Sequence, residues 1–109
     1  MAIMEHVDRE HGRGTVPIAD VYAQIREFAA ACDAREVILF GSRAKGMNRP
    51  KSDIDLAVRG CRRFDELNRH LQDDLWSLLK VDVINLDEPV TEELRREIAA
   101  SGKVLYEKV

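Results

Sequence analysis

Two short apolar runs, joined by a glycine–serine corner and a polar loop, constrain this chain more than any other feature. The first run, residues 37–40, ends abruptly at Gly41 and Ser42. Ten residues separate Ser42 from Asp53, and a second apolar run then continues around Asp55. Short apolar runs that are rich in β-branched residues and bounded by turn residues are typical of buried strands. The stretch therefore predicts two strands connected by a tight corner and a loop.

The two aspartates of the second run predict a metal site. Residues two apart in a strand share a face, so Asp53 and Asp55 point the same way while Ile54 and Leu56 point to the other side. Neighbouring carboxylates repel each other unless a proton or a cation lies between them. Oxygen ligands on a rigid strand suit Mg²⁺, which proteins usually hold with one or two carboxylates plus substrate phosphates. We therefore expect Mg²⁺ beside a phosphate-bearing substrate.

The glycine–serine corner predicts the phosphate side of the same site. Gly41 has no side chain to keep a phosphate away from the backbone, and a helical turn after it would offer free N–H groups to an anion. Between Arg43 and Arg63 the sequence has seven Lys or Arg but only two acidic residues, the proposed metal ligands. We therefore expect the phosphate groups of a ligand to bind at Gly41, Ser42, Arg43 and Lys45.

Known phosphate and nucleophile motifs do not explain the corner. Gly41 and Gly46 have the spacing of a P-loop, but Met47 and Asn48 stand where Lys and then Ser or Thr are needed. The serine also lacks the Gly-x-Ser-x-Gly flanks of a nucleophile elbow. The pattern instead resembles the signature of the DNA polymerase β-like nucleotidyltransferases: Gly-Ser, ten residues, Asp-x-Asp. The alternative is a β-hairpin whose aspartates are merely solvated.

The order of the expected elements matches the palm of that superfamily. Apolar residues at spacings of three and four predict helices, and short apolar runs predict strands. The expected fold class is α/β (α+β), a mixed β-sheet packed on helices. The elements are a helix over 17–33 with Thr15 as a possible cap, strands over 36–40 and 53–58, a helix with an apolar stripe from Phe64 to Leu78, a strand over 81–84, a helix opened by Pro89 and Thr91 and ended by Gly102, and a strand over 104–106.

Asp82 is a candidate third carboxylate. It lies inside the apolar run 81–84, and a polar group at the centre of a strand is costly unless it is paired. One interpretation is a hydrogen-bonded aspartate of the core. The other is a metal ligand and catalytic residue beside Asp53 and Asp55, and the superfamily supplies such a residue from a later strand. We favour the second interpretation.

Within the superfamily, the chain most resembles the minimal nucleotidyltransferases, which consist of little beyond the palm. These are commonly encoded beside small helical proteins of the HEPN type, and several such pairs are toxin–antitoxin systems. In those pairs the nucleotidyltransferase is the antitoxin and transfers AMP from ATP to a tyrosine of the toxin. The resemblance implies the same activity here, with Mg²⁺ and ATP, a hetero-oligomer with a HEPN-type partner, and catalysis by Asp53, Asp55 and Asp82.

Two other functions stay open at this point. The chain could be a non-catalytic antitoxin that neutralises its partner by contact. It could also be a small-molecule nucleotidyltransferase, such as one that modifies aminoglycosides, although those enzymes carry extra helices for the acceptor.

Length and composition agree with one small globular domain. With 109 residues, 45% of them hydrophobic and 34% charged, we expect a polar tail over residues 1–14 and a nucleotidyltransferase domain over 15–109. The tail has no signal-peptide pattern, and no apolar run approaches the ~20 residues of a membrane span.

The net charge of −3 argues against free nucleic acid as the main partner. Cys32 and Cys61 have no metal or redox spacing and predict a reducing cytoplasm.

A few single residues need an interpretation of their own. His6 and His11 lie among charged residues and two glycines in the tail, where nothing else resembles the ligand set of a metal site, so we expect no metal there. His70 falls off the apolar stripe of its helix and is expected to be a solvated surface residue. Trp76 lies at the edge of that stripe, as a partly buried core residue or as an anchor for a partner.

Overall fold

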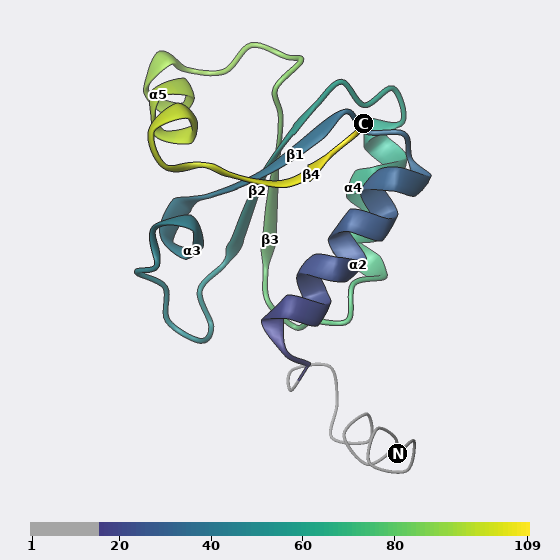
Figure 1. The fold of residues 1–109 in the computed structure, drawn as a ribbon, viewed down its shortest axis with the longest axis vertical. Coiled ribbons are helices and arrows are strands. Elements are labelled where there is room, and N and C mark those ends of the chain that lie inside the picture. Colours follow the sequence, from purple (N-terminus) through teal and green to yellow (C-terminus); the bar gives the residue numbers. More distant parts are fainter. Residues whose placement is uncertain (1–15) are drawn as a thin grey trace.

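The computed structural model describes residues 16–109, and it shows a four-stranded sheet with helices on both faces (Figure 1). The strand order is β3-β2-β1-β4; β1 pairs antiparallel with β2 and β4, and β2 pairs parallel with β3. The predicted mixed sheet of an α+β fold is therefore confirmed. In chain order the elements are α2 (Ile18–Ala31), β1 (Glu36–Phe40), α3 (Gly41–Lys45), β2 (Ile54–Arg59), α4 (Phe64–Asp73), β3 (Val81–Asn85), α5 (Glu92–Ser101) and β4 (Lys103–Glu107).

One face of the sheet carries the larger core. Helices α2 and α4 lie side by side over this face (Figure 1). Alternate residues of β2, Ile54, Leu56 and Val58, are fully buried beneath them. This alternation follows from the pleat of a strand, which sends every second side chain to the same side. The helices contribute the fully or almost fully buried residues Val21, Ile25, Ala29, Leu67 and Leu71.

The opposite face carries a smaller core beneath α5. Ala57 of β2 and Ile98 of α5 belong to this cluster, and α3 lies on the same side of the sheet as α5 (Figure 1). The alternation of β2 sends Asp55 to this face together with Ala57. The other buried members of the cluster are Ile38, Phe40 and Leu86.

The ends of α2 and α4 differ from the sequence-based expectation. Pro17 is the N-cap residue of α2 and has a non-helical ψ of 144°, so the helix begins at Ile18. The expected cap Thr15 and the tail lie outside the described residues. Helix α4 ends at Asp73, and Leu78 is 78% exposed, so the prediction of a helical stripe through Leu78 is wrong. The chain turns back after α4 because β3 must run parallel to β2.

Gly102 ends α5, as predicted, but the reason is packing rather than a left-handed cap. Its backbone is extended, with φ of −67° and ψ of 147°. A Cβ at this position would overlap the carbonyl oxygen of Ile98 and lie 2.7 Å from Cγ2 of Ile38. The absence of a side chain therefore lets α5 pass directly into β4 close to β1.

The prediction for His70 is also wrong. Its ring is stacked on Phe28 of α2, with ring centroids 5.0 Å apart and an interplanar angle of 7°.

Trp76 lies in the loop after α4 and is 39% exposed, and its backbone N–H donates to Oε1 of Gln24 at 2.7 Å. Within residues 16–109, no helix is both long and apolar enough to cross a membrane.

Candidate active site

The corner between β1 and α3 places Gly41 directly against a carboxylate of the neighbouring strand. Phe40, the last residue of β1, pairs with Asp55 of β2. Gly41 follows with φ of +76°, and a Cβ added to it would overlap Oδ2 of Asp55 and lie 3.1 Å from its Cγ. Glycine is required here for both reasons, because other residues rarely adopt this φ and their side chain would collide with the carboxylate.

The sheet also brings Asp55 and Asp82 together. The two residues are direct partners in the parallel register of β2 and β3, so their side chains share the α5 face. Asp53 is exposed and lies immediately before β2, which runs from Ile54 to Arg59 instead of over the predicted residues 53–58. Nζ of Lys80 lies 3.7 Å from Oδ1 of Asp82. All three aspartates proposed from the sequence therefore lie around one end of β2.

The carboxylates repel one another in this arrangement. Burial raises the pKa of Asp55 above its ordinary value of 3.8, and the negative charges of Asp82 and Asp53 raise it further. A side-chain hydrogen bond with Asp82 and the charge of Glu97 act in the same direction. In the part of the chain that the structure describes, the three aspartates do not place one oxygen each within 4.8 Å of the other two. A divalent cation would remove this repulsion.

Arg43 holds the loop that leads to Asp53. Its Nε and Nη2 donate to the carbonyl of Ser52 at 3.1 and 2.9 Å, and Nη2 also donates to the carbonyl of Pro50 at 3.1 Å. The hydroxyl of Ser52 accepts a hydrogen bond from the N–H of Arg49 at 2.8 Å, which closes the turn. The loop therefore has a defined shape immediately before the aspartates.

Lys45 and an acid of α5 complete the charged surroundings. Nζ of Lys45 lies 3.9 Å from Oε2 of Glu97, and the same glutamate contributes to the raised pKa of Asp55. Sequence reasoning missed Glu97, because nothing in its local pattern distinguishes it from the other glutamates of α5. Only the packing of α5 against the α3 side of the sheet reveals its position.

A cavity of about 820 Å³ opens beside Asp53. Arg43 and Lys80 contribute charge to its wall, while Ile18 and Leu79 contribute apolar surface. The volume falls in the usual range for small-molecule and cofactor sites, and a lining of apolar groups with a few polar ones is typical of them. The cavity therefore adjoins Asp53, whereas Asp55 and Asp82 do not line it, and it has room for a nucleotide-sized ligand.

Comparison with known proteins identifies the family. The family model for "Polymerase beta, Nucleotidyltransferase" matches residues 23–109. The chain belongs to the polymerase β nucleotidyltransferase family. It is a nucleotidyltransferase, as the Gly-Ser and Asp-x-Asp pattern predicts. No protein with a curated function matches the sequence.

Solved structures of toxin–antitoxin complexes share the fold of this nucleotidyltransferase. One, a toxin–antitoxin with AMP-PNP, is 26% identical, with a TM-score of 0.64 over 80% of this chain and 73% of that one. Another is the complex of a tri-AMPylated Shewanella oneidensis HEPN toxin with its MNT antitoxin. It is 23% identical, with a TM-score of 0.58 over 81% of this chain and 71% of that one, a likeness that shows the fold alone.

Proposed function

We propose that the chain transfers AMP from ATP to a hydroxyl of a protein partner, with release of pyrophosphate, in a reaction that depends on Mg²⁺. The expected partner is a small helical protein of the HEPN type, the expected acceptor is a tyrosine, and the two chains form a hetero-oligomer. The observation that carries the proposal is the Asp55 carboxylate held against Gly41 with Asp82 beside it. The likeness to complexes containing AMP-PNP and a tri-AMPylated HEPN toxin supports the choice of donor and acceptor.

The aspartates fit a site for one or two Mg²⁺ ions. Asp53, Asp55 and Asp82 offer the hard oxygen ligands that Mg²⁺ prefers, and their mutual repulsion raises the pKa of Asp55. When bound, Mg²⁺ stabilises the negative charge that develops on the attacking and leaving oxygens in nucleotidyl transfer. Asp53 and Asp55 would hold the donor side, and Asp82 would face the acceptor.

The corner and the loop position the donor in this proposal. Gly41 and Ser42 lie beside the aspartates and would seat the β- and γ-phosphates through their backbone N–H groups. The Nε and Nη2 atoms of Arg43 are engaged with loop carbonyls, so Nη1 is the atom we assign to a phosphate. Lys45 would add positive charge from α3, near Glu97.

Asp82 would accept the proton of the acceptor hydroxyl. A hydroxyl attacks a phosphorus atom poorly while it is protonated, and a carboxylate within hydrogen-bond reach removes that proton in the transition state. Asp82 is half-buried at the edge strand β3 and is therefore accessible from solvent on the side where a partner could approach.

The decisive experiment measures AMP transfer to a co-expressed HEPN-type protein by intact mass spectrometry. The parent chain should add AMP units to the partner, and Asp55→Asn should reduce transfer on the order of 1000-fold, because metal stabilisation of a transition state is worth several kcal/mol. Asp73→Asn makes the same charge change at the exposed end of α4 and should transfer like the parent. No transfer by the folded parent chain with ATP and Mg²⁺ would refute the proposal.

A second measurement separates catalysis from contact. If Asp55→Asn protects cells from the partner as well as the parent chain does, neutralisation works by binding and AMP transfer is not its cause. Asp82→Asn tests the role of the third carboxylate. We expect it to lower turnover far more than ATP affinity, since Asp53 and Asp55 would still hold the donor side. A destabilised but fully active variant would show that Asp82 has only a structural role.

A further inference from the structure

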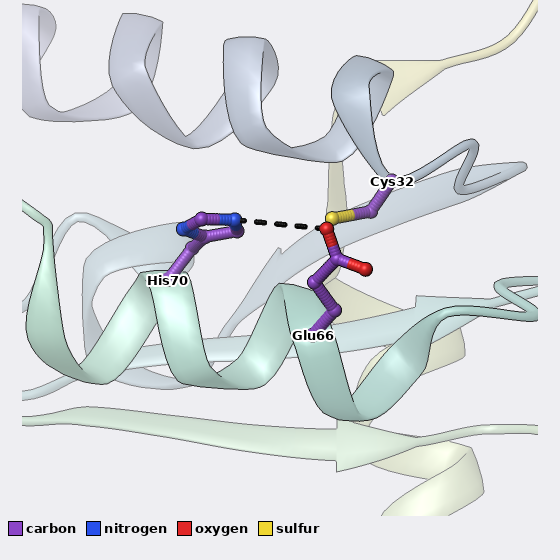
Figure 2. A group of neighbouring side chains, drawn as sticks. All are labelled: Cys32, Glu66 and His70. Atoms are coloured by element: carbon purple, nitrogen blue, oxygen red, sulfur yellow. Dashed lines mark ion pairs between the residues drawn. The ribbon is translucent and has the colours of Figure 1, made fainter.

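Three ligand-type side chains meet between α2 and α4, on the sheet face opposite the aspartates. They are Cys32, which directly follows α2, and Glu66 and His70 of α4. Figure 2 shows the three side chains pointing toward one another across the gap between the helices. One ligand atom from each residue lies within 4.8 Å of the other two. Nothing in the nucleotidyl transfer proposed above uses this group.

The helical repeat explains how the group is assembled. Glu66 and His70 are one turn apart on α4, so their side chains share a face of that helix. Phe28 and Cys32 have the same spacing at the end of α2. The His70 ring stacks on Phe28, which fixes the ring between the helices and directs one edge toward Cys32 and Glu66 (Figure 2).

His70 is oriented as a metal ligand would be. Its Nδ1 lies 2.7 Å from Oδ2 of Asp74, and since a carboxylate can only accept, Nδ1 carries the proton. The lone pair of the neutral ring is then on Nε2, which lies 3.9 Å from Oε2 of Glu66. A carboxylate that holds the remote nitrogen in this way accompanies most histidines that bind metals, because it fixes the tautomer and the ring orientation.

Glu66 and Cys32 are the other two candidate ligands. Arg63 donates to both oxygens of Glu66, at 3.1 and 2.7 Å, which fixes the position of this carboxylate on α4. Such outer hydrogen bonds are common on carboxylates that bind metals. Cys32 is fully buried, whereas Glu66 and His70 are half-buried, so an ion could reach the thiol from solvent between them.

We propose that Cys32, Glu66 and His70 form a zinc site that ties the end of α2 to α4. A set of one sulfur, one nitrogen and one oxygen ligand suits Zn²⁺ better than Mg²⁺ or Ca²⁺. Ligand atoms of a tetrahedral zinc ion are roughly 3.3 to 3.6 Å apart, given its usual bond lengths, so only a small closure of the group is needed. On binding the ion, the Cys32 thiol would release its proton to water; the resulting thiolate and the Glu66 carboxylate would then balance the charge of the ion, and water would take the fourth position.

The same side chains have an explanation without a metal. In that case His70 and Glu66 form an ion pair and Cys32 is a buried thiol that serves only to fill the core. A bond between the sulfur of Cys32 and an ion exists only in the first explanation, the zinc site. The test must therefore report on a thiolate–metal bond at Cys32 and not merely on metal binding somewhere in the chain.

The experiment adds Co²⁺ and, in parallel, Zn²⁺ to the metal-free full chain with Mg²⁺ in excess to occupy the aspartates. Cobalt reports a bound thiolate through a charge-transfer absorption band, and zinc should displace it at one equivalent per chain. We expect the band in the parent and in Cys61→Ser, the matched control at the other buried cysteine. We expect no band in Cys32→Ser, and zinc affinity lowered by more than about 100-fold.

The remaining variants test the other ligands. His70→Gln and Glu66→Gln should each weaken zinc binding by at least about 10-fold, and Asp74→Ala, which removes the orienting carboxylate, by about 10- to 100-fold. Circular dichroism without metal establishes which variants fold, and if Cys32→Ser does not, His70→Gln and Glu66→Gln decide. The absence of a thiolate band in the parent chain overturns the proposal. A band that persists in folded Cys32→Ser also overturns it, and so does an unchanged zinc affinity in both glutamine variants. The proposed AMP transfer would be unaffected by any of these results.

Discussion

The two faces of the sheet divide stability and chemistry between them. The face under α2 and α4 has a deep core, with three successive inward residues of β2 completely buried. The face under α5 has a small cluster of five buried residues and, next to it, carboxylates that repel one another. A protein is only marginally stable overall, so a site built from repelling charges depends on favourable packing elsewhere. Here that packing lies on the opposite side of the same strands.

Strand β2 belongs to both regions. Ile54, Leu56 and Val58 face the deep core, whereas Asp55 and Ala57 face α5. A strand with such strict alternation is rigid, because half of its side chains are locked in packing. The Asp55 carboxylate is therefore held in place by the residues on either side of it in the sequence.

The largest expected effect comes from comparing a deep-core leucine with an isoleucine of the small cluster. Leu67→Ala should lower the free energy of unfolding by about 3 to 5 kcal/mol, because α2, α4 and the sheet enclose the side chain and the cavity cannot collapse. Ile98→Ala on α5 should lower it by about 2 to 3 kcal/mol, at the low end of the usual range. Urea unfolding of both variants measures the difference. A greater loss from Ile98→Ala would show that the α5 face is the more important for stability.

The next effect isolates the contact between the corner and the carboxylate. Gly41 and Gly46 have nearly equal positive φ, +76° and +72°, so alanine at either position carries a similar backbone penalty of about 1 to 2 kcal/mol. Only Gly41→Ala also collides with Asp55, whereas no atom lies within 4 Å of a Cβ at Gly46. We expect Gly41→Ala to reduce AMP transfer by about 100-fold, since small misplacements of reacting groups have effects of that size. Gly46→Ala, assayed at the same folded concentration, should stay near the parent rate; equal losses would argue against the close contact.

A smaller effect should follow from the cap of α5. The hydroxyl of Thr91 accepts a hydrogen bond from the N–H of Leu94 at 3.2 Å, which satisfies one free donor at the start of the helix. Thr91→Ala should lower the free energy of unfolding by about 1 kcal/mol, and Thr91→Ser should restore most of it. Hydrogen exchange of the α5 amides should accelerate in the alanine variant. An unchanged exchange rate would mean that packing alone holds this helix.

The smallest effect has the opposite sign. The raised pKa of Asp55 means that the folded chain binds more protons than the unfolded chain between the ordinary value of 3.8 and the raised value. The free energy of unfolding therefore falls as the pH rises through that window, and the loss is complete above it. Without divalent cations, Asp55→Asn should melt at a higher temperature than the parent at neutral pH and lose this advantage below the window. The gain is small because the group is partly open to solvent, and a lower melting temperature at neutral pH would contradict the prediction.

The active-site elements were the most predictable part of the molecule. Strand β1 has the bounds that its apolar run predicts, and the glycine–serine corner opens α3 as expected. These features are local, because apolar runs and turn residues determine backbone conformation over a few residues. The family followed from the same stretch, since the spacing of Gly-Ser and Asp-x-Asp lies within one strand–corner–strand unit.

The helices were less predictable. The stripe of α4 continues at helical spacing to Leu78, yet the helix ends at Asp73 and Leu78 is exposed. Periodicity reports which residues could share a face, but the position of β3 decides where the chain must turn back. His70 was placed in solvent for a similar reason, because its stacking partner belongs to another helix.

By itself the sequence determined the strands, the corner and the place of Asp55 in β2, all of which depend on neighbours within a few positions. The parallel register that sets Asp82 beside Asp55, the approach of Glu97 and the meeting of Cys32 with Glu66 and His70 were decided only by the tertiary structure. Each joins segments that are distant in the chain. Such contacts depend on how whole layers pack against each other, and hydrophobic packing is not directional enough for a local pattern to specify which residues will meet.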